Sequence, residues 1–302
     1  KPSINSYLLW PISIFIKFIN FLKVLLKNKK RYSSIKTICI GNIYLGGTGK
    51  TSLSLKINDI LKDKNIKRYF IKKFYSDQID EQMFLKEKTK SVVKENRVDA
   101  INFAINNALD VIIFDDGLQE KKIDYDLKIV CFKVKNWIGN GQLIPAGPLR
   151  EKLNSLKNYD VVFLNGKDEV VKDIKKIILN INPKIKIFNS YYEISNLDEL
   201  DKKSEYIIFS GIGDPSSFRE VLEENNIKVV KEIIFPDHFF YKENDIKNII
   251  NKAEEINAKI LTTEKDFIKL YNYETKKIHP LKIDLKIIEE KKFIKFLNEK
   301  IN

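Results

Sequence analysis

The stretch TICIGNIYLGGTGKT, residues 37–51, decides the fold of this 302-residue chain. Thr37 to Ile40 is short and apolar, as expected of a buried strand, and the segment Thr51 to Leu61 that follows has a helical pattern. A glycine-rich loop lies between them. A strand that leads through such a loop into a helix is typical of a phosphate-binding loop, because glycines let backbone N–H groups surround phosphate oxygens at a helix amino end.

This loop predicts how a nucleoside triphosphate is bound. Lys50 would reach the β- and γ-phosphates, and the hydroxyl of Thr51 would ligate Mg²⁺. Tyr44 stands where the usual first glycine is expected, and Leu45 excludes the variant that has a lysine before the paired glycines. A glycine-rich turn without a ligand is the alternative. The predicted nucleotide-binding residues are Gly46, Gly47, Thr48, Gly49, Lys50 and Thr51.

A second apolar segment, Val111 to Phe114, ends in two adjacent acids, Asp115 and Asp116. Carboxylates at the end of a buried strand beside a phosphate-binding loop are where Mg²⁺ or its water shell is held. Because neighbouring side chains point in different directions, one acid can hold the metal while the other positions a neighbour. The alternative is that the pair caps a helix or binds a solvated lysine.

Strand and helix patterns alternate along the rest of the chain. Short buried strands separated by helices predict an α/β fold with a parallel sheet and helices on both faces. The segment Lys184 to Ser195 is expected to be extended and to link this part to a second, smaller α/β lobe. The further predicted elements are a helix at Val98–Leu109, strands at Leu127–Phe132 and Tyr159–Leu164, and, in the second lobe, strands at Tyr206–Ser210, Val229–Phe235 and Lys259–Thr262 with helices from Asp214 and over Glu243–Asn257.

The most hydrophobic segment, Tyr7 to Leu26, also carries polar residues, which argue against an ordinary spanning helix. Taken as a helix, it gathers Ser13, Lys17, Asn20, Lys23 and Lys27 within about 120° of its circumference and leaves a broad apolar face. Such a helix lies in a bilayer interface, and the basic run at residues 27–31 favours anionic headgroups. A core helix is the alternative.

Composition excludes disorder, since 43% of the residues are hydrophobic. The net charge of +13 has three explanations: a diffuse compositional bias, an anionic membrane or substrate, and, last, nucleic acid. Cys39 and Cys131 lie in apolar runs without metal-ligand spacing, which favours a reducing compartment. His238 follows Asp237 after an apolar strand and could assist proton transfer, although a surface histidine without a role is the alternative.

Several motifs coincide in order along nearly the whole chain, and together they resemble the tetraacyldisaccharide 4'-kinase family of lipid A synthesis. They are Gly41-Asn42 with the glycine-rich loop, Asp115-Asp116-Gly117-Leu118-Gln119, Gly139-Asn140-Gly141, Pro145 through Glu151, Gly211-Ile212-Gly213, Phe235-Pro236-Asp237-His238 and Thr263-Glu264-Lys265-Asp266.

The resemblance implies transfer of the γ-phosphate of MgATP to the 4'-hydroxyl of a lipid disaccharide 1-phosphate by a two-lobed P-loop kinase. It also implies that Asp80, within Ile79-Asp80-Glu81-Gln82, forms a catalytic dyad with His238, and that Glu151 joins Thr51, Asp115 and Asp116 at the Mg²⁺ site. We therefore expect a membrane-associated helix over residues 1–31, a kinase domain over 32–195 and a second lobe over 196–302.

The expected setting is the cytoplasmic face of the inner membrane of a Gram-negative bacterium, as a monomer that binds no nucleic acid. The chain departs from the family pattern around Lys72 to Tyr75, near a loop shortened at Phe74, and at Glu120 and Phe239, where the family usually has histidines. A second hypothesis is a membrane-associated P-loop ATPase or switch that acts on a protein partner.

Overall fold

We describe a computed structural model of the chain, which covers residues 9–13, 29–73, 79–89, 91–94, 96–120, 122–166, 170–273 and 275–301. Contacts group the chain into two units. The first contains residues 1–73, 90–191 and 286–302, and the second contains residues 74–89 and 192–285. The chain therefore passes between the units after residues 73, 89, 191 and 285.

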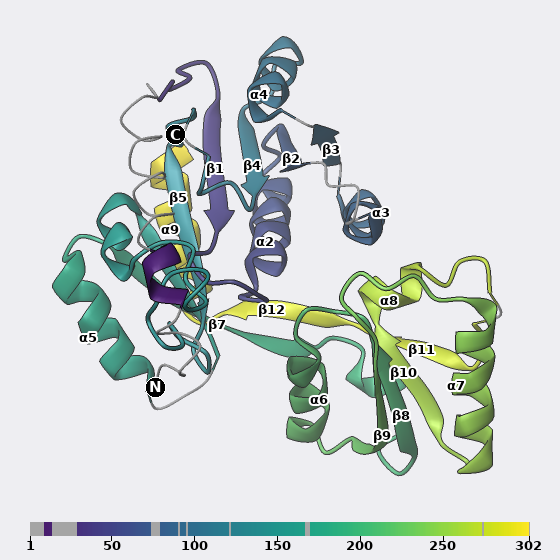
Figure 1. Cartoon of the computed structure of the whole chain (residues 1–302). Coiled ribbons are helices and arrows are strands. Elements are labelled where there is room, and N and C mark those ends of the chain that lie inside the picture. The colour runs from purple at the N-terminus through teal and green to yellow at the C-terminus, as the bar shows by residue number, and fades with distance from the viewer. Residues whose placement is uncertain are drawn as a thin grey trace. The chain divides into compact units, whose positions relative to one another are not determined.

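An eight-stranded sheet forms the core of the first unit, in the order β12-β7-β6-β5-β1-β4-β2-β3 (Figure 1). The strand β1 is parallel to both of its neighbours, and so are β2, β5 and β6. The predicted parallel sheet is confirmed. Its strands are β1 (Lys36–Gly41), β2 (Arg68–Lys73), β3 (Ser91–Lys94), β4 (Val111–Asp115), β5 (Leu127–Lys133), β6 (Val161–Asn165), β7 (Lys186–Ile194) and β12 (Ile283–Ile287).

Helices cover both faces of this sheet, as predicted. Val162 and Leu164 of β6 belong to the same buried cluster as Ile174. Phe163, between them, packs edge-on against Phe293 with ring centroids 5.0 Å apart. Because successive strand residues point to opposite faces, the helices that carry Ile174 and Phe293 lie on opposite sides. The helices of the first unit are α2 (Lys50–Asp63), α4 (Arg97–Asn106), α5 (Val171–Ile181) and α9 (Glu290–Ile301).

The second unit contains a smaller sheet in the order β11-β10-β8-β9, in which every pairing is parallel. The predicted second α/β lobe thus has its own parallel sheet. Its strands are β8 (Glu205–Ser210), β9 (Lys228–Ile234), β10 (Lys259–Thr263) and β11 (Ile278–Leu281), and its helices are α3 (Ile79–Lys88), α6 (Pro215–Glu224), α7 (Glu243–Glu255) and α8 (Glu264–Ile268).

The helix α3 was not predicted, and its burial explains why. It buries Asp80 and Gln82 together with Phe84 and Leu85, so half of its buried side chains are polar. An apolar stripe at helical spacing, which is the usual signal, is therefore missing. The helix packs against α8, which follows it in sequence by more than 170 residues.

The predicted N-terminal helix, Tyr7 to Leu26, lies largely outside the described residues. Of this segment residues 9–13 are described, and they are helical. Within the described part of the chain, every helix is too short or too polar to cross a membrane.

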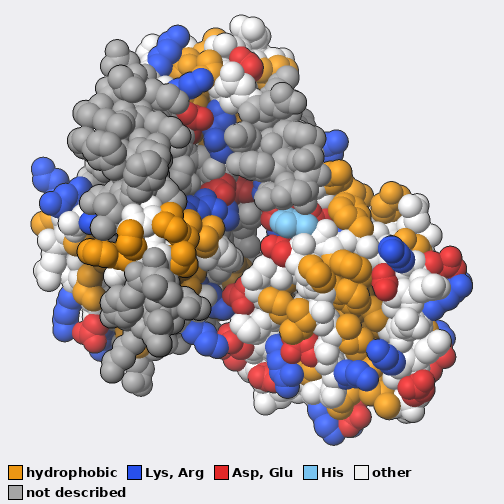
Figure 2. Space-filling model, viewed as in Figure 1, with side chains coloured by type: hydrophobic (Ala, Val, Ile, Leu, Met, Phe, Trp, Pro, Cys, Tyr) orange, Lys and Arg blue, Asp and Glu red, His pale blue; other side chains and the backbone are white. Residues whose placement is uncertain are grey.

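Both cysteines are buried and free, as their apolar surroundings predicted. Burial raises the pKa of the Cys39 thiol and of the Cys131 thiol, so neither is activated as a nucleophile or ligand. The charged side chains of the second unit are mixed in sign on the face shown in Figure 2, where lysines and arginines alternate with acids. On that face of the second unit, positive charge is interspersed with negative charge rather than gathered into one basic patch.

Candidate active site

The glycine-rich loop connects β1 to α2, as the sequence predicted. Gly46 has a φ of +111° and Gly49 a φ of +85°, which are conformations that side chains disfavour. Gly49 precedes α2 and makes no side-chain cap, so the amide groups at the amino end of the helix are left for an anion. Asn42 fixes the loop, since its Nδ2 donates to the Gly46 carbonyl (3.2 Å) and to Thr48 Oγ1 (3.1 Å).

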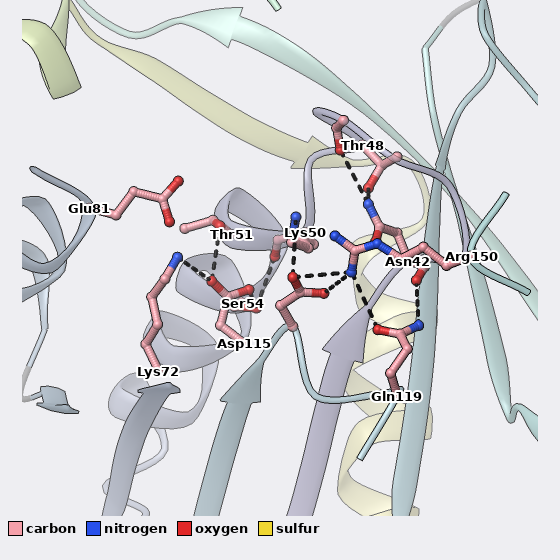
Figure 3. A network of polar contacts seen from close by, with 12 residues as sticks. Asn42, Thr48, Lys50, Thr51, Ser54, Lys72, Glu81, Asp115, Gln119 and Arg150 are labelled. Atoms are coloured by element: carbon pink, nitrogen blue, oxygen red, sulfur yellow. Dashed lines mark hydrogen bonds and ion pairs between the residues drawn. The ribbon is translucent and has the colours of Figure 1, made fainter. Parts of the chain in front are cut away.

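Asp115 ends β4, and its side chain is completely buried. Three groups compensate its charge (Figure 3). Thr51 Oγ1 donates to Oδ2 at 3.0 Å. The Ser54 hydroxyl shares its single proton between the Lys50 carbonyl at 2.9 Å and Oδ1 of Asp115 at 3.3 Å. The Nζ of Lys72, at the end of β2, lies 3.5 Å from Oδ2. The structure therefore places the acid beside Thr51, its predicted partner in metal binding.

Asp116 follows in a left-handed conformation with a φ of +54°, and its amide donates to the Ile40 carbonyl at 2.8 Å. This turn points its carboxylate away from that of Asp115. Arg150 Nη1 donates to Oδ1 at 3.0 Å, and Lys50 Nζ lies 3.9 Å from Oδ2. The two acids have different partners, as the sequence suggested.

Arg97 holds the same turn through the backbone. It begins α4, and its Nη2 donates to the Asp116 carbonyl at 2.6 Å. Its Nη1 lies 3.8 Å from a carboxylate oxygen of Glu120, which the resemblance noted above marked as a departure. Glu120 therefore supplies a charged partner to the arginine that supports Asp116.

Glu151 is oriented by two donors. Gln119 Nε2 donates to Oε1 at 3.1 Å, and the Tyr159 hydroxyl donates to Oε2 at 2.8 Å. Burial, followed by the charge of Glu151, raises the pKa of Tyr159, so its phenol stays protonated and remains a donor. Gln119 Oε1 also accepts from Arg150 Nη1 at 3.3 Å (Figure 3). Gln119 and Arg150 therefore connect Glu151 to Asp116.

Backbone hydrogen bonds fix the loop that carries Arg150 and Glu151. Leu45 N–H donates to the Pro148 carbonyl, and Arg150 N–H donates to the Ile43 carbonyl, both at 2.8 Å. Tyr44, the exception in the glycine-rich loop, forms an isolated bridge with Leu149. The extended conformation of Tyr44 therefore holds the loop with Arg150 and Glu151 beside the glycine-rich loop.

Asp80 and His238 lie in the second unit, where the structure brings them into contact. The His238 Nδ1 is 2.7 Å from Asp80 Oδ1. Asp80 is 2% exposed, whereas the His238 side chain is 20% exposed. His238 has a φ of +59°, and its amide donates to the Gly211 carbonyl at 3.2 Å. Phe239, at the other departure from the family pattern, stacks on Phe235 with centroids 4.8 Å apart.

Sequence reasoning did not single out Lys72, Ser54 or Arg97, which support Asp115 and Asp116 in the structure. Lys72 follows the apolar run Tyr69 to Ile71 near the end of β2, and that position was a usable signal. Ser54 and Arg97 had none, because a serine one helical turn after Thr51 and an arginine at a helix start are common surface residues.

A glycine-rich strand-to-helix loop, with a threonine that bonds to an acid on the adjacent parallel strand, defines a P-loop nucleotide-binding protein. The model of the family described as LpxK, tetraacyldisaccharide-1-P 4'-kinase, matches residues 5–302. The chain belongs to this family. It therefore acts as a tetraacyldisaccharide 4'-kinase, a phosphotransferase of lipid A biosynthesis, and the first of the two hypotheses is confirmed.

Individual relatives agree over the full length. The chain is 49% identical to the tetraacyldisaccharide 4'-kinase of Pelagibacter ubique (strain HTCC1062), covering 99% of this chain and 96% of that protein. It is 33% identical to that of Rickettsia typhi, covering 100% and 95%. The crystal structure of "apo" form LpxK from Aquifex aeolicus in complex with ATP superimposes with a TM-score of 0.68 at 28% identity, covering 98% of this chain and 97% of that one.

Proposed function

We propose that this kinase uses Asp80 as the base for the 4'-hydroxyl and the residues 46–51 as the site of the ATP phosphates. The contact of 2.7 Å between Asp80 and His238 carries the proposal, because it joins a buried carboxylate to a partly exposed imidazole. A sugar hydroxyl is not acidic enough to attack a phosphoryl group without losing its proton, and a carboxylate held by a histidine can accept it.

The first unit supplies the donor side. The amino end of α2 and the Lys50 ammonium would bind the β- and γ-phosphates, and Gly46, Gly47, Thr48 and Gly49 would supply the loop around them. The relative from Aquifex aeolicus, which was crystallised with ATP, supports ATP as the nucleotide.

The oxygen-rich end of β4 fits Mg²⁺. Thr51 Oγ1 and Asp115 Oδ2 lie 3.0 Å apart, and hydroxyl and carboxylate oxygens are the ligands that Mg²⁺ prefers. Among the described residues no group of three or more His, Cys, Asp or Glu side chains surrounds one point. That suits Mg²⁺, which keeps several waters and is held by one or two carboxylates plus phosphates. Thr51 and Asp115 would hold it directly, and Asp116 and Glu151, the other acids proposed for this site, would contact its bound waters.

The residues act on the transfer as follows. Asp80 takes the proton of the 4'-hydroxyl, whose oxygen forms a bond to the γ-phosphorus while the bond from that phosphorus to the bridging oxygen breaks and leaves ADP with the electron pair. Lys50 stabilises the charge that develops on the phosphoryl oxygens. His238 holds the carboxylate through Nδ1. Bound Mg²⁺ would neutralise charge on the phosphates.

We also propose that the N-terminal segment contacts the membrane on its cytoplasmic face, and that the chain works as a monomer. Trp10 and Ile12 are about half exposed (53% and 49%), whereas Ser13 is buried. Ser13 Oγ donates to the Leu143 carbonyl at 3.1 Å and accepts from the Ala146 amide at 3.2 Å. Residues 9–13 are thus held to the protein through Ser13 and expose the apolar side chains of Trp10 and Ile12.

Replacing the proposed base should separate catalysis from nucleotide binding. For Asp80→Ala we expect the rate of labelled phosphate transfer from ATP to the lipid acceptor to fall by ~10²–10⁴, the usual effect of losing a general base, with the Kd for ATP unchanged. Asp201→Ala, which removes an exposed acid of the same unit, serves as the control. Unchanged turnover in Asp80→Ala would remove this residue from the site.

The proposed metal site predicts a shift in the Mg²⁺ requirement. Thr51→Val keeps the shape of the side chain and removes its oxygen, so half-maximal activity should need roughly tenfold more Mg²⁺, as for a lost ligand contact. A magnesium titration of turnover at fixed ATP checks this. The same requirement in variant and parent would show that Thr51 is not a ligand.

Membrane contact can be measured by co-sedimentation with vesicles that contain anionic phospholipid. The pair Trp10→Ser with Ile12→Ser should lower the bound fraction, because less apolar surface enters the interface. Tyr271→Ser, at a side chain that is 71% exposed in the second unit, is the matched control. Equal binding of parent and the double variant would contradict the proposal.

A further inference from the structure

Lys269 directly follows α8 and has a fully buried side chain. A lysine without solvent exposure is rare, because its ammonium loses hydration that only carboxylates or other strong acceptors can replace. The carboxylates that surround this ammonium therefore indicate what it does.

Its first partner is Asp266, whose Oδ1 lies 2.6 Å from the Lys269 Nζ. Asp266 is itself immobilised by three donors: the Gly211 amide at 3.1 Å, Thr263 Oγ1 at 2.7 Å and the Tyr241 hydroxyl at 2.8 Å. Burial, followed by the charge of Asp266, raises the pKa of Tyr241, so its phenol stays protonated and donates. Asp266 is thus a fixed anchor, and it fixes Lys269.

The second neighbour of the ammonium is the proposed base. Lys269 Nζ lies 3.8 Å from Asp80 Oδ2, and the other oxygen, Oδ1, is the one in contact with His238. Each oxygen of this buried carboxylate therefore faces a different nitrogen. Attraction between charges is several times stronger in such a buried setting than in water.

We propose that Lys269 is a positioning residue for phosphate transfer, which holds Oδ2 of Asp80 while His238 holds Oδ1. This inference rests on the role proposed above for Asp80. The capping pair Thr263 and Asp266 then has a purpose beyond starting α8, since it anchors the lysine that orients the base.

Two other ion pairs already attach α3 to α8 and allow this role to be told apart from simple tethering. Glu81 pairs with Lys265, and Lys88 pairs with Glu264, both at 2.7 Å. Lys88→Met therefore breaks a contact between the same two helices without touching Asp80, and is the matched control.

The test is steady-state phosphate transfer by Lys269→Met, with the MgATP concentration varied at saturating acceptor. We expect kcat to fall by ~10–100-fold, as for loss of a group that orients a functional side chain, with the KM for ATP unchanged. Lys88→Met should keep the parent rate. Because removal of Lys269 leaves two carboxylates buried, the pair Lys269→Met with Asp266→Asn replaces it if the single variant does not fold.

A double-mutant cycle decides whether Lys269 acts through Asp80. If it does, Asp80→Asn combined with Lys269→Met is no slower than Asp80→Asn alone, because there is no longer a base to position. Effects that multiply would overturn the proposal and leave Lys269 a structural role.

The assignment of Asp80 as the base and the positioning role of Lys269 can be contradicted independently. Parent-like turnover in Asp80→Asn would contradict the base assignment itself. Slow turnover in Asp80→Asn together with a parent rate in the folded Lys269 variant would contradict only the positioning role.

Discussion

The buried carboxylate of Asp115 is the constraint on which the donor site depends. A charge without solvent must be compensated, and here Thr51, Ser54 and Lys72 do so from the first turns of α2 and from the end of β2. This requires β4 to lie between β1 and β2, as the sheet order has it. The same contacts that satisfy the buried acid therefore set the glycine-rich loop in register with the acidic strand end.

In the second unit a buried carboxylate is likewise compensated, but by different residues. Asp80 is buried and faces His238 and Lys269, and Lys269 is in turn balanced by Asp266. The segment 74–89 groups with this unit although residues on either side of it belong to the first. The helix α3, whose buried face is half polar, belongs to the second unit and packs there against α8, which is far away in sequence. This packing brings the proposed base, Asp80, to His238.

Features that depend on residues close together in sequence were predicted from local patterns. The loop at 46–51, the strand that ends in Asp115, the larger parallel sheet and the second α/β lobe follow from hydrophobic spacing and glycine placement, and the structure confirms them. The contact of Lys72 with Asp115 depends on strand order, although the place of this lysine after an apolar run was a local signal. The contact of Lys269 with Asp80 depends on pairing with a helix far away in sequence and has no local signal. The contact of Asp80 with His238 was reached through resemblance to the family, since nothing in the spacing of the two residues indicates it.

The most direct measurement is ³¹P NMR spectroscopy of the acceptor after incubation with this protein, ATP and Mg²⁺ in detergent micelles. The tetraacyldisaccharide 1-phosphate should gain a second phosphomonoester resonance, coupled to the proton at the 4' carbon, as ADP accumulates. ADP with free inorganic phosphate and an unchanged acceptor would contradict phosphate transfer to the lipid, and would show that the donor site only hydrolyses its nucleotide.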